Sequence, residues 1–221
     1  MSESDLVLRD ASGLRSIPDL FVEVIDQYYA DGNAVREFGL GCTFTAPFTG
    51  TWRGLQSVQR YPNTESVFYD LAGRIPVKGE TTWTEIETSF KFWGRPSAGM
   101  FAVLLEGQED TVHFHHRSGT WAAVCYLCRQ NEIGRAKGLG FYRHRETGAY
   151  SCHGATKELL ECFRRDAAHH ECWEEVGAID LVFNRMVLFN GRFFHAASPG
   201  FGDSPATGRL TQLFNIDFKT S

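Results

Sequence analysis

Two histidines separated by one residue, His113 and His115, are the residues in this sequence best suited to bind a metal ion. They lie in the segment TVHFHH, whose composition is typical of a β-strand. Side chains on a strand alternate between its two faces, so His113 and His115 are expected on the same side. Two imidazoles on one face can clamp a transition metal. A single histidine is more often hydrogen-bonded or exposed, so the pattern needs support from other residues.

A third histidine, His195, supplies that support. It follows in the segment GRFFHAA, far along the chain and on another expected strand. A clamp on one strand with a histidine on a distant strand is the layout of a facial metal triad, which leaves coordination positions open. The usual triad has two histidines and one carboxylate, and here His115 stands at the carboxylate position. We predict that His113, His115 and His195 are the metal ligands and the catalytic residues.

Arg209 and Thr211 are candidates for binding a carboxylate. They lie on the last expected strand, fourteen and sixteen residues after His195, and share a face of it. A guanidinium beside a hydroxyl suits the capture of a carboxylate, such as the far carboxylate of 2-oxoglutarate. Arg143 is a further candidate for binding the ketoacid or an anionic substrate, and its neighbour His144 could support the metal site. The alternatives are an exposed strand arginine and a loop-fixing role.

The chain resembles the 2-oxoglutarate/Fe(II)-dependent dioxygenase superfamily, and more closely a poorly characterised bacterial branch of it. The most specific segments are FYRHRETG and GRLTQ, and the resemblance covers most of the chain. The segments that carry it are His113-Phe114-His115, 122–128, 138–148, 184–189, His195 and 208–212, with a weaker likeness over 24–38. It implies Fe(II) and 2-oxoglutarate as cofactors and O2 as co-substrate. The implied reaction is hydroxylation, desaturation or cyclisation of a small molecule, an amino-acid derivative or a carrier-bound intermediate.

His115 departs from this family, in which the corresponding residue is aspartate. If His115 is a ligand, the neutral triad leaves more positive charge on the metal and favours anionic ligands. Otherwise His115 swings away from the metal, or the protein is a non-catalytic binding module on a degenerate barrel. Three-histidine oxygenases of the related cupin barrel use no 2-oxoglutarate, which is another alternative. Copper is also allowed, because imidazole suits several first-row metals.

The segments around these residues predict a mainly β protein. Alternating or apolar runs predict strands at FVEVI, between residues 80 and 130, at IDLVFNRMVLF and at the C-terminal RLTQLFNIDF. The dipeptide Asn190-Gly191 between two apolar runs predicts a β-hairpin. The fold class expected is a double-stranded β-helix, that is, a jelly-roll or cupin-like barrel, with flanking α-helices.

Helices and irregular segments complete the expected organisation. ADGNAVREFGLG predicts a capped helix, 43–79 an irregular mouth of the active site, 131–140 a glycine-rich loop, and 155–175 an amphipathic helix. We expect one domain over 1–221. Within it, residues 1–79 would form a helical and irregular support region and residues 80–221 the jelly-roll core.

Composition limits the classes of partner. The 221 residues carry a net charge of −5, so the chain lacks the basic surface of a nucleic-acid binder. No apolar run approaches the roughly 18–20 residues that span a bilayer. We therefore expect a small-molecule substrate, no nucleic-acid or membrane partner, and a cytoplasmic location, with a homodimer left open. Reduced cysteines fit that location. A zinc site built from Cys152, His153, Cys162, His169, His170 or Cys172 is left as an alternative, although the spacing matches no zinc-finger or ribbon pattern.

Overall fold

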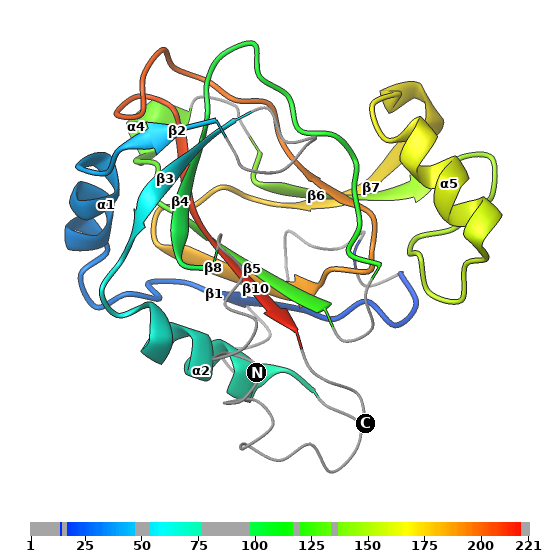
Figure 1. Cartoon of the computed structure of the whole chain (residues 1–221), viewed down its shortest axis with the longest axis horizontal. Coiled ribbons are helices and arrows are strands. Elements are labelled where there is room, and N and C mark those ends of the chain that lie inside the picture. The colour runs from blue at the N-terminus through cyan, green and yellow to red at the C-terminus, as the bar shows by residue number, and fades with distance from the viewer. Residues whose placement is uncertain are drawn as a thin grey trace.

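The computed structural model describes residues 14, 17–46, 54–76, 98–116, 120–133 and 137–217. These residues form a mainly β structure with two antiparallel sheets and a few helices (Figure 1). The predicted strands between residues 80 and 97 lie outside the described residues. Among the described helices, none is long and apolar enough to cross a membrane.

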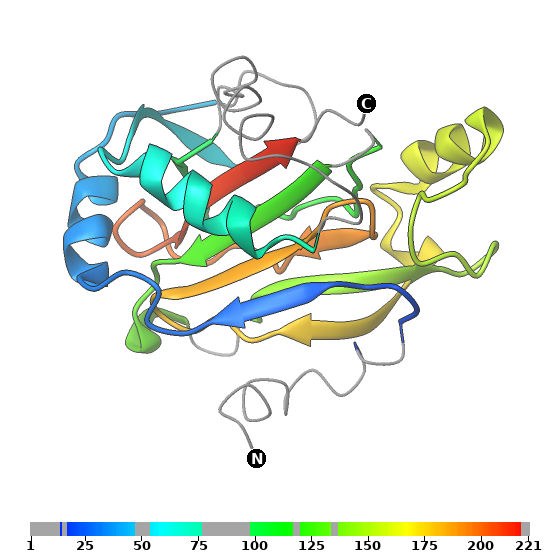
Figure 2. The same cartoon turned by 90° about the horizontal axis from the view of Figure 1, so that it is seen from below.

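The larger sheet has seven strands in the order β1-β8-β5-β10-β4-β3-β2. Figure 2 shows β10, β5, β8 and β1 side by side, with α2 crossing over this face. At its centre β10 pairs with β5 and β4, which places Thr211 opposite Tyr126 and Ala102. The strands are β1 (Val22–Ile25), β2 (Phe44–Thr45), β3 (Leu55–Arg60), β4 (Met100–Leu104), β5 (Thr120–Tyr126), β8 (Arg185–Asn190) and β10 (Arg209–Asp217).

The smaller sheet has three strands in the order β7-β6-β9, with β6 at Leu139–His144, β7 at Trp173–Ile179 and β9 at His195–Ala197. An antiparallel bridge between His113 and His195 joins the segment around residue 113 to this sheet. The two sheets face each other. The ring of Phe189 on β8 contacts Phe141 on β6 and His195 on β9, at centroid distances of 5.6 and 4.8 Å.

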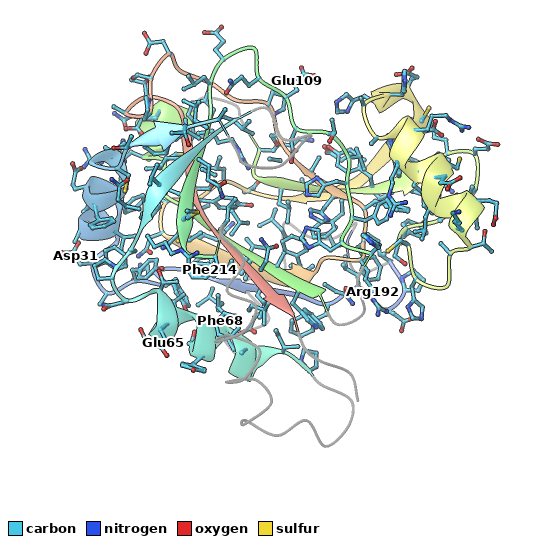
Figure 3. All side chains as sticks on the ribbon, viewed as in Figure 1. Asp31, Glu65, Phe68, Glu109, Arg192 and Phe214 are labelled. Atoms are coloured by element: carbon cyan, nitrogen blue, oxygen red, sulfur yellow. The ribbon has the colours of Figure 1, made fainter. Side chains whose placement is uncertain are left out.

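Helices α1 (Gly32–Leu40) and α2 (Thr64–Arg74) lie against the larger sheet. Asp31 caps α1 by accepting a hydrogen bond from the Ala34 amide at 2.9 Å. The short helix α4 covers Gln130–Ile133. In Figure 3, Phe68 of α2 lies near Phe214 of β10, and both side chains are buried. Burial of apolar side chains such as these is the main stabilising contribution to folding.

The outer face of the smaller sheet has its own apolar cluster. Helix α5 (Lys157–Asp166) contributes Phe163, which packs against Trp173 of β7 and Phe194. The ring centroids of Trp173 and Phe194 lie 4.9 Å apart. Phe194 and His195 are consecutive, so their side chains take opposite faces of the sheet. His195 therefore faces the larger sheet, while Phe194 packs beneath α5.

The structure corrects several element predictions. The Asn190-Gly191 hairpin is wrong, because β8 belongs to the larger sheet and β9 to the smaller one, so the chain crosses between sheets here. The irregular segment 43–79 contains β2, β3 and α2, and β3 pairs with β4. The helix predicted over 155–175 ends at Asp166, and a 3₁₀ turn (η3, His170–Cys172) leads into β7. The capped helix, the FVEVI strand and the C-terminal strand are confirmed.

Candidate metal centre

His113 and His195 are brought together by backbone pairing. The His113 amide donates to the His195 carbonyl at 2.9 Å, and the His195 amide donates back to the His113 carbonyl at 3.0 Å. Residues directly opposite in an antiparallel pair present their side chains on the same face. The His115 amide donates to the Gly191 carbonyl at 2.7 Å, which fixes the next histidine beside the crossover from β8 to β9.

The three imidazoles converge on one point. The ring centroid of His113 lies 4.3 Å from that of His195 and 5.8 Å from that of His115, and the last two are 5.2 Å apart. One ligand nitrogen from each ring lies within 4.8 Å of the other two. His195 is buried, whereas 37% of the His113 side chain is exposed, so the cluster has a buried side and an accessible side.

The outer nitrogens of two rings are held by carbonyl oxygens. Nδ1 of His195 lies 2.6 Å from the Phe193 carbonyl, and Nδ1 of His113 lies 2.9 Å from the Thr111 carbonyl. A carbonyl only accepts, so both Nδ1 atoms carry the proton. In the neutral form of each ring, Nε2 then has no proton and can coordinate a metal. Such outer hydrogen bonds orient metal-binding histidines and select their tautomer.

The electrostatics of the cluster keep His195 neutral. Burial lowers the pKa of His195 well below its ordinary 6.5, and the neighbouring His113 and His115 lower it further. A neutral imidazole is the form that binds a metal.

Gly191 makes room for the His115 ring. A Cβ atom at residue 191 would lie 2.5 Å from Nδ1 of His115 and 3.0 Å from its Cγ. The dipeptide that predicted a hairpin turn therefore has a different role here. Gly191 lies at the crossover between sheets, and its missing side chain lets an imidazole pack against the backbone.

Asp110 places a carboxylate beside His113. It is 6% exposed, its Oδ2 accepts a hydrogen bond from the Ala197 amide at 2.9 Å, and the same atom lies 3.8 Å from Nδ1 of His113. Sequence reasoning missed Asp110, because nothing in the local pattern shows that the loop before His113 folds against β9. Its negative charge lies next to a triad that has none of its own.

A buried guanidinium lies deeper in the same interior. Arg209 is 4% exposed and donates from Nη2 to the Gly138 carbonyl at 2.9 Å. Among the described residues, its Nε has no hydrogen-bond partner and no acidic residue forms an ion pair with it. The Gly138 carbonyl also accepts from the amide of Ser198, three residues beyond His195. At a strand rise of about 3.3 Å per residue, that contact lies about 10 Å from His195, just beyond the end of β9.

Tyr126 adds a hydroxyl to this end of the interior, and sequence reasoning missed it. The guanidinium carbon of Arg209 lies 5.9 Å from the Tyr126 ring centroid. The Tyr126 hydroxyl is buried without a hydrogen-bond partner in the described part of the chain, and burial raises its pKa, so the phenol stays protonated. Thr211, opposite Tyr126, donates weakly to the Ala102 carbonyl at 3.4 Å. Arg209 and Tyr126 together offer donors suited to an anion.

Arg143 is not brought to this interior. Its Nε donates to Oε2 of Glu174 on β7 at 2.9 Å, and 39% of its side chain is exposed. The hydrogen bond to Glu174 raises the pKa of Arg143. The structure therefore places Arg143 in a cross-strand ion pair, and it does not bring Arg143 together with the three histidines. Its neighbour His144 belongs to the cluster beneath α5, where its ring contacts Trp173 at 4.8 Å.

In a comparison with known proteins, the chain is similar to a family whose function is unknown. Residues 108–216 match the model of a protein family described as "Family of unknown function (DUF6445)". The matched stretch contains the three histidines, Tyr126, Arg209 and Thr211. No curated protein matches the chain significantly.

Proposed function

We propose that this protein is a non-haem metal oxygenase that uses Fe(II) and 2-oxoglutarate to oxidise a small molecule. His113, His115 and His195 hold the metal, and Arg209, Tyr126 and Thr211 hold the far carboxylate of the ketoacid. One observation carries the proposal: three imidazoles converge in an interior that also buries an arginine with no acidic partner among the described residues.

The order of the strands supports the jelly roll within this proposal. From β4 in the larger sheet the chain passes to the His113 segment in the smaller sheet, then to β5 in the larger. Strands β6 and β7 lie in the smaller sheet, β8 in the larger, β9 in the smaller and β10 in the larger. Repeated crossing between two facing antiparallel sheets is the winding of an eight-stranded jelly roll. We assign the core from β4 to β10 to that fold.

The donor set fits iron. Three imidazoles suit Fe, Zn, Cu and Ni, and three protein ligands leave positions for a co-substrate. His195 is neutral and its Nε2 is free of a proton, as coordination requires. The buried Asp110 carboxylate, 3.8 Å from His113, supplies negative charge next to the neutral triad. Its place outside the triad strengthens His113 as a ligand without occupying a coordination position.

The part of the interior that contains Arg209 and Tyr126 fits the far carboxylate of 2-oxoglutarate. A buried polar atom without a partner carries a desolvation penalty of about 1–3 kcal/mol, and Arg209 and Tyr126 each have one. A bound carboxylate would accept from both, and Arg209 would compensate its charge. When bound, Fe(II) and the ketoacid supply the activation of O2 for substrate oxidation. The chain's own residues orient both cofactors, and Phe189 and Phe141 keep water from the buried side of the triad.

A three-histidine oxygenase that does not use 2-oxoglutarate is the second candidate. The observation that favours it is His115 at the carboxylate position, which leaves the triad without negative charge. In that case the carboxylate that meets Arg209 belongs to an anionic substrate. A non-catalytic binding module would keep the fold without stoichiometric metal.

Reconstitution separates these candidates. Metal-free protein is loaded anaerobically with Fe(II) and titrated with 2-oxoglutarate, and succinate is measured after O2 is admitted. The proposal predicts one Fe(II) per chain, a visible charge-transfer band that saturates with the ketoacid, and succinate release. Metal binding without any effect of the ketoacid would favour the second candidate. Absence of stoichiometric metal would contradict both oxygenases.

Two arginine variants locate the ketoacid. Arg209→Leu should keep Fe(II) binding and lower 2-oxoglutarate affinity about tenfold or more, because charged hydrogen bonds contribute about 1.5–3 kcal/mol. Arg143→Gln is the matched control and should leave that affinity unchanged, since Arg143 pairs with Glu174. Normal ketoacid binding by Arg209→Leu would remove Arg209 from the site.

A further inference from the structure

A second group of metal-binding side chains lies under α5. It consists of His144, Glu146, Cys162 and Asp166, and one ligand atom from each lies within 4.8 Å of those of the others. His144 ends β6 and Glu146 follows in the next turn. Cys162 and Asp166 are four residues apart on α5, so they share one face of that helix. The strand end and the helix face therefore meet at one point.

The atoms of this group already point at one another. Nε2 of His144 lies 3.1 Å from Oδ2 of Asp166, and the Cys162 thiol donates to the same oxygen at 3.6 Å. Nδ1 of His144 lies 3.1 Å from Oγ1 of Thr147, which can accept a hydrogen bond from Nδ1–H when Nε2 binds a metal. His144 is 0% exposed and Asp166 is 7% exposed, so the imidazole and carboxylate are held in a protected place.

The group lies on the other face of the smaller sheet from the three-histidine centre. The ring of His144 contacts Phe163 and Trp173, at 5.2 and 4.8 Å, within the apolar cluster beneath α5. His195 instead contacts Phe189 of the larger sheet. A metal here would not share a ligand with the proposed iron centre.

We propose that His144, Glu146, Cys162 and Asp166 bind a divalent metal of the zinc class. Thiolate, imidazole and carboxylate are the donors that zinc takes in tetrahedral sites, and four protein ligands are typical of a structural site. With the thiolate formed, the donors carry three negative charges. A divalent cation and Arg165, which contacts Asp166 at 2.9 Å and Cys162 at 3.3 Å, balance them. Binding releases the thiol proton to solvent.

Such a metal would join α5 to the end of β6. Strand β6 also pairs with β9, which carries His195. The metal is therefore a structural clamp on the outer side of the sheet that supports the candidate iron centre. Without it, α5 is linked to the end of β6 at this point by the contact between His144 and Asp166.

Cobalt is a suitable probe, because only the second of the two sites contains a thiolate. Metal-free, reduced protein is titrated with Co(II), and the thiolate-to-cobalt charge-transfer absorption is recorded. The three-histidine centre contains no thiolate, so the absorption reports only the second site. We expect it in the wild-type protein, with Zn(II) abolishing it stoichiometrically and the total reaching two metal equivalents per chain.

Three single serine variants identify the sulfur. Cys162→Ser should lose the thiolate absorption and one equivalent of metal. Cys172→Ser, after α5, and Cys152→Ser, whose Sγ lies 3.9 Å from the His115 carbonyl, are matched controls and should keep both. Zn(II) should also raise the melting temperature of the wild type more than that of Cys162→Ser. The proposal is overturned if no thiolate absorption develops, if it survives Cys162→Ser, or if it is lost in either control.

Discussion

At His115 an imidazole stands where the resembled dioxygenases have aspartate. The ring centroid of His115 lies 5.8 Å from that of His113 and 5.2 Å from that of His195, so its side chain points toward the other two histidines. The three rings carry no negative charge, while Asp110 lies just outside them. At the scale of single residues, the proposed function therefore depends on whether His115 binds the metal.

The His115→Ala variant tests this role. Removing one of three ligands should lower Fe(II) affinity by more than the roughly 10–100-fold typical of losing an outer hydrogen bond to a metal ligand. The measurement is anaerobic equilibrium binding with a competing chelator. His116→Ala is the control, because His116 is exposed and follows His115 on the opposite face. Equal affinities for the two variants would show that His115 is not a ligand.

The Tyr126→Phe variant should affect the stability of the protein and its binding of 2-oxoglutarate differently. The buried hydroxyl of Tyr126 has no hydrogen-bond partner in the described part of the chain, so removing it should leave the free energy of unfolding unchanged or about 1 kcal/mol higher. Loss of a donor to the ketoacid should raise the dissociation constant of 2-oxoglutarate about tenfold.

Tyr29→Phe is the matched control for that variant. Tyr29 donates to Oε1 of Gln212 at 2.6 Å, away from the triad. It should lose about 1 kcal/mol of stability and keep ketoacid affinity. Urea unfolding and calorimetric titration check both variants, and a destabilised Tyr126→Phe with normal affinity would contradict the role given to Tyr126.

At the scale of elements, the crossover from β8 to β9 positions the site. Gly191 should tolerate no side chain, since a Cβ would lie 2.5 Å from the His115 ring. We expect Gly191→Ala to displace the His115 ring. Fe(II) binding should then weaken at least about tenfold, because His115 would no longer be placed as a ligand. Gly41→Ala, where the nearest atom lies 3.4 Å away, is the control. Unchanged metal affinity in Gly191→Ala would show that His115 is not held against this backbone.

The sequence predicts elements where the signal is local. The capped helix in ADGNAVREFGLG, the alternation that puts His113 and His115 together, and the apolar run of β10 are all short-range patterns. The hairpin at Asn190-Gly191 failed because a turn signal does not reveal which sheet the next strand joins. Strand β7 was missed because WEEVGAI has few apolar residues in alternation and follows directly on a helical pattern.

Contacts between distant strands could not be predicted in the same way. Tyr126 meets Arg209 because β5 and β10 pair in a register that places Thr211 opposite Tyr126. Asp110 reaches His113 because its loop folds onto β9. The group under α5 combines a strand end with a helix face, so cysteine spacing alone gave no indication of it.

At the scale of the whole molecule, buried tyrosines should limit stability in alkali. Burial raises the pKa of Tyr28, Tyr29 and Tyr126 above its ordinary value of 10.0. Above about pH 10 the unfolded chain releases these protons while the folded chain keeps them, so stability falls as pH rises. Each tyrosine contributes up to about 1.4 kcal/mol per pH unit.

Urea unfolding between about pH 9 and 11 measures this slope. Tyr126→Phe should make it shallower by the contribution of one proton, because one buried phenol no longer ionises on unfolding. An unchanged slope would show that Tyr126 ionises equally easily in the folded and unfolded chains.

The central proposal is that the three histidines bind iron and that Arg209, buried between the two facing sheets, binds the ketoacid. A crystal structure of the protein soaked anaerobically with Fe(II) and 2-oxoglutarate, with anomalous scattering at the iron edge, tests it most directly. We expect an anomalous peak bonded to Nε2 of His113 and His195 and to a ring nitrogen of His115, with the ketoacid reaching Arg209. No peak among these histidines, or a peak that His115 does not contact, would contradict it.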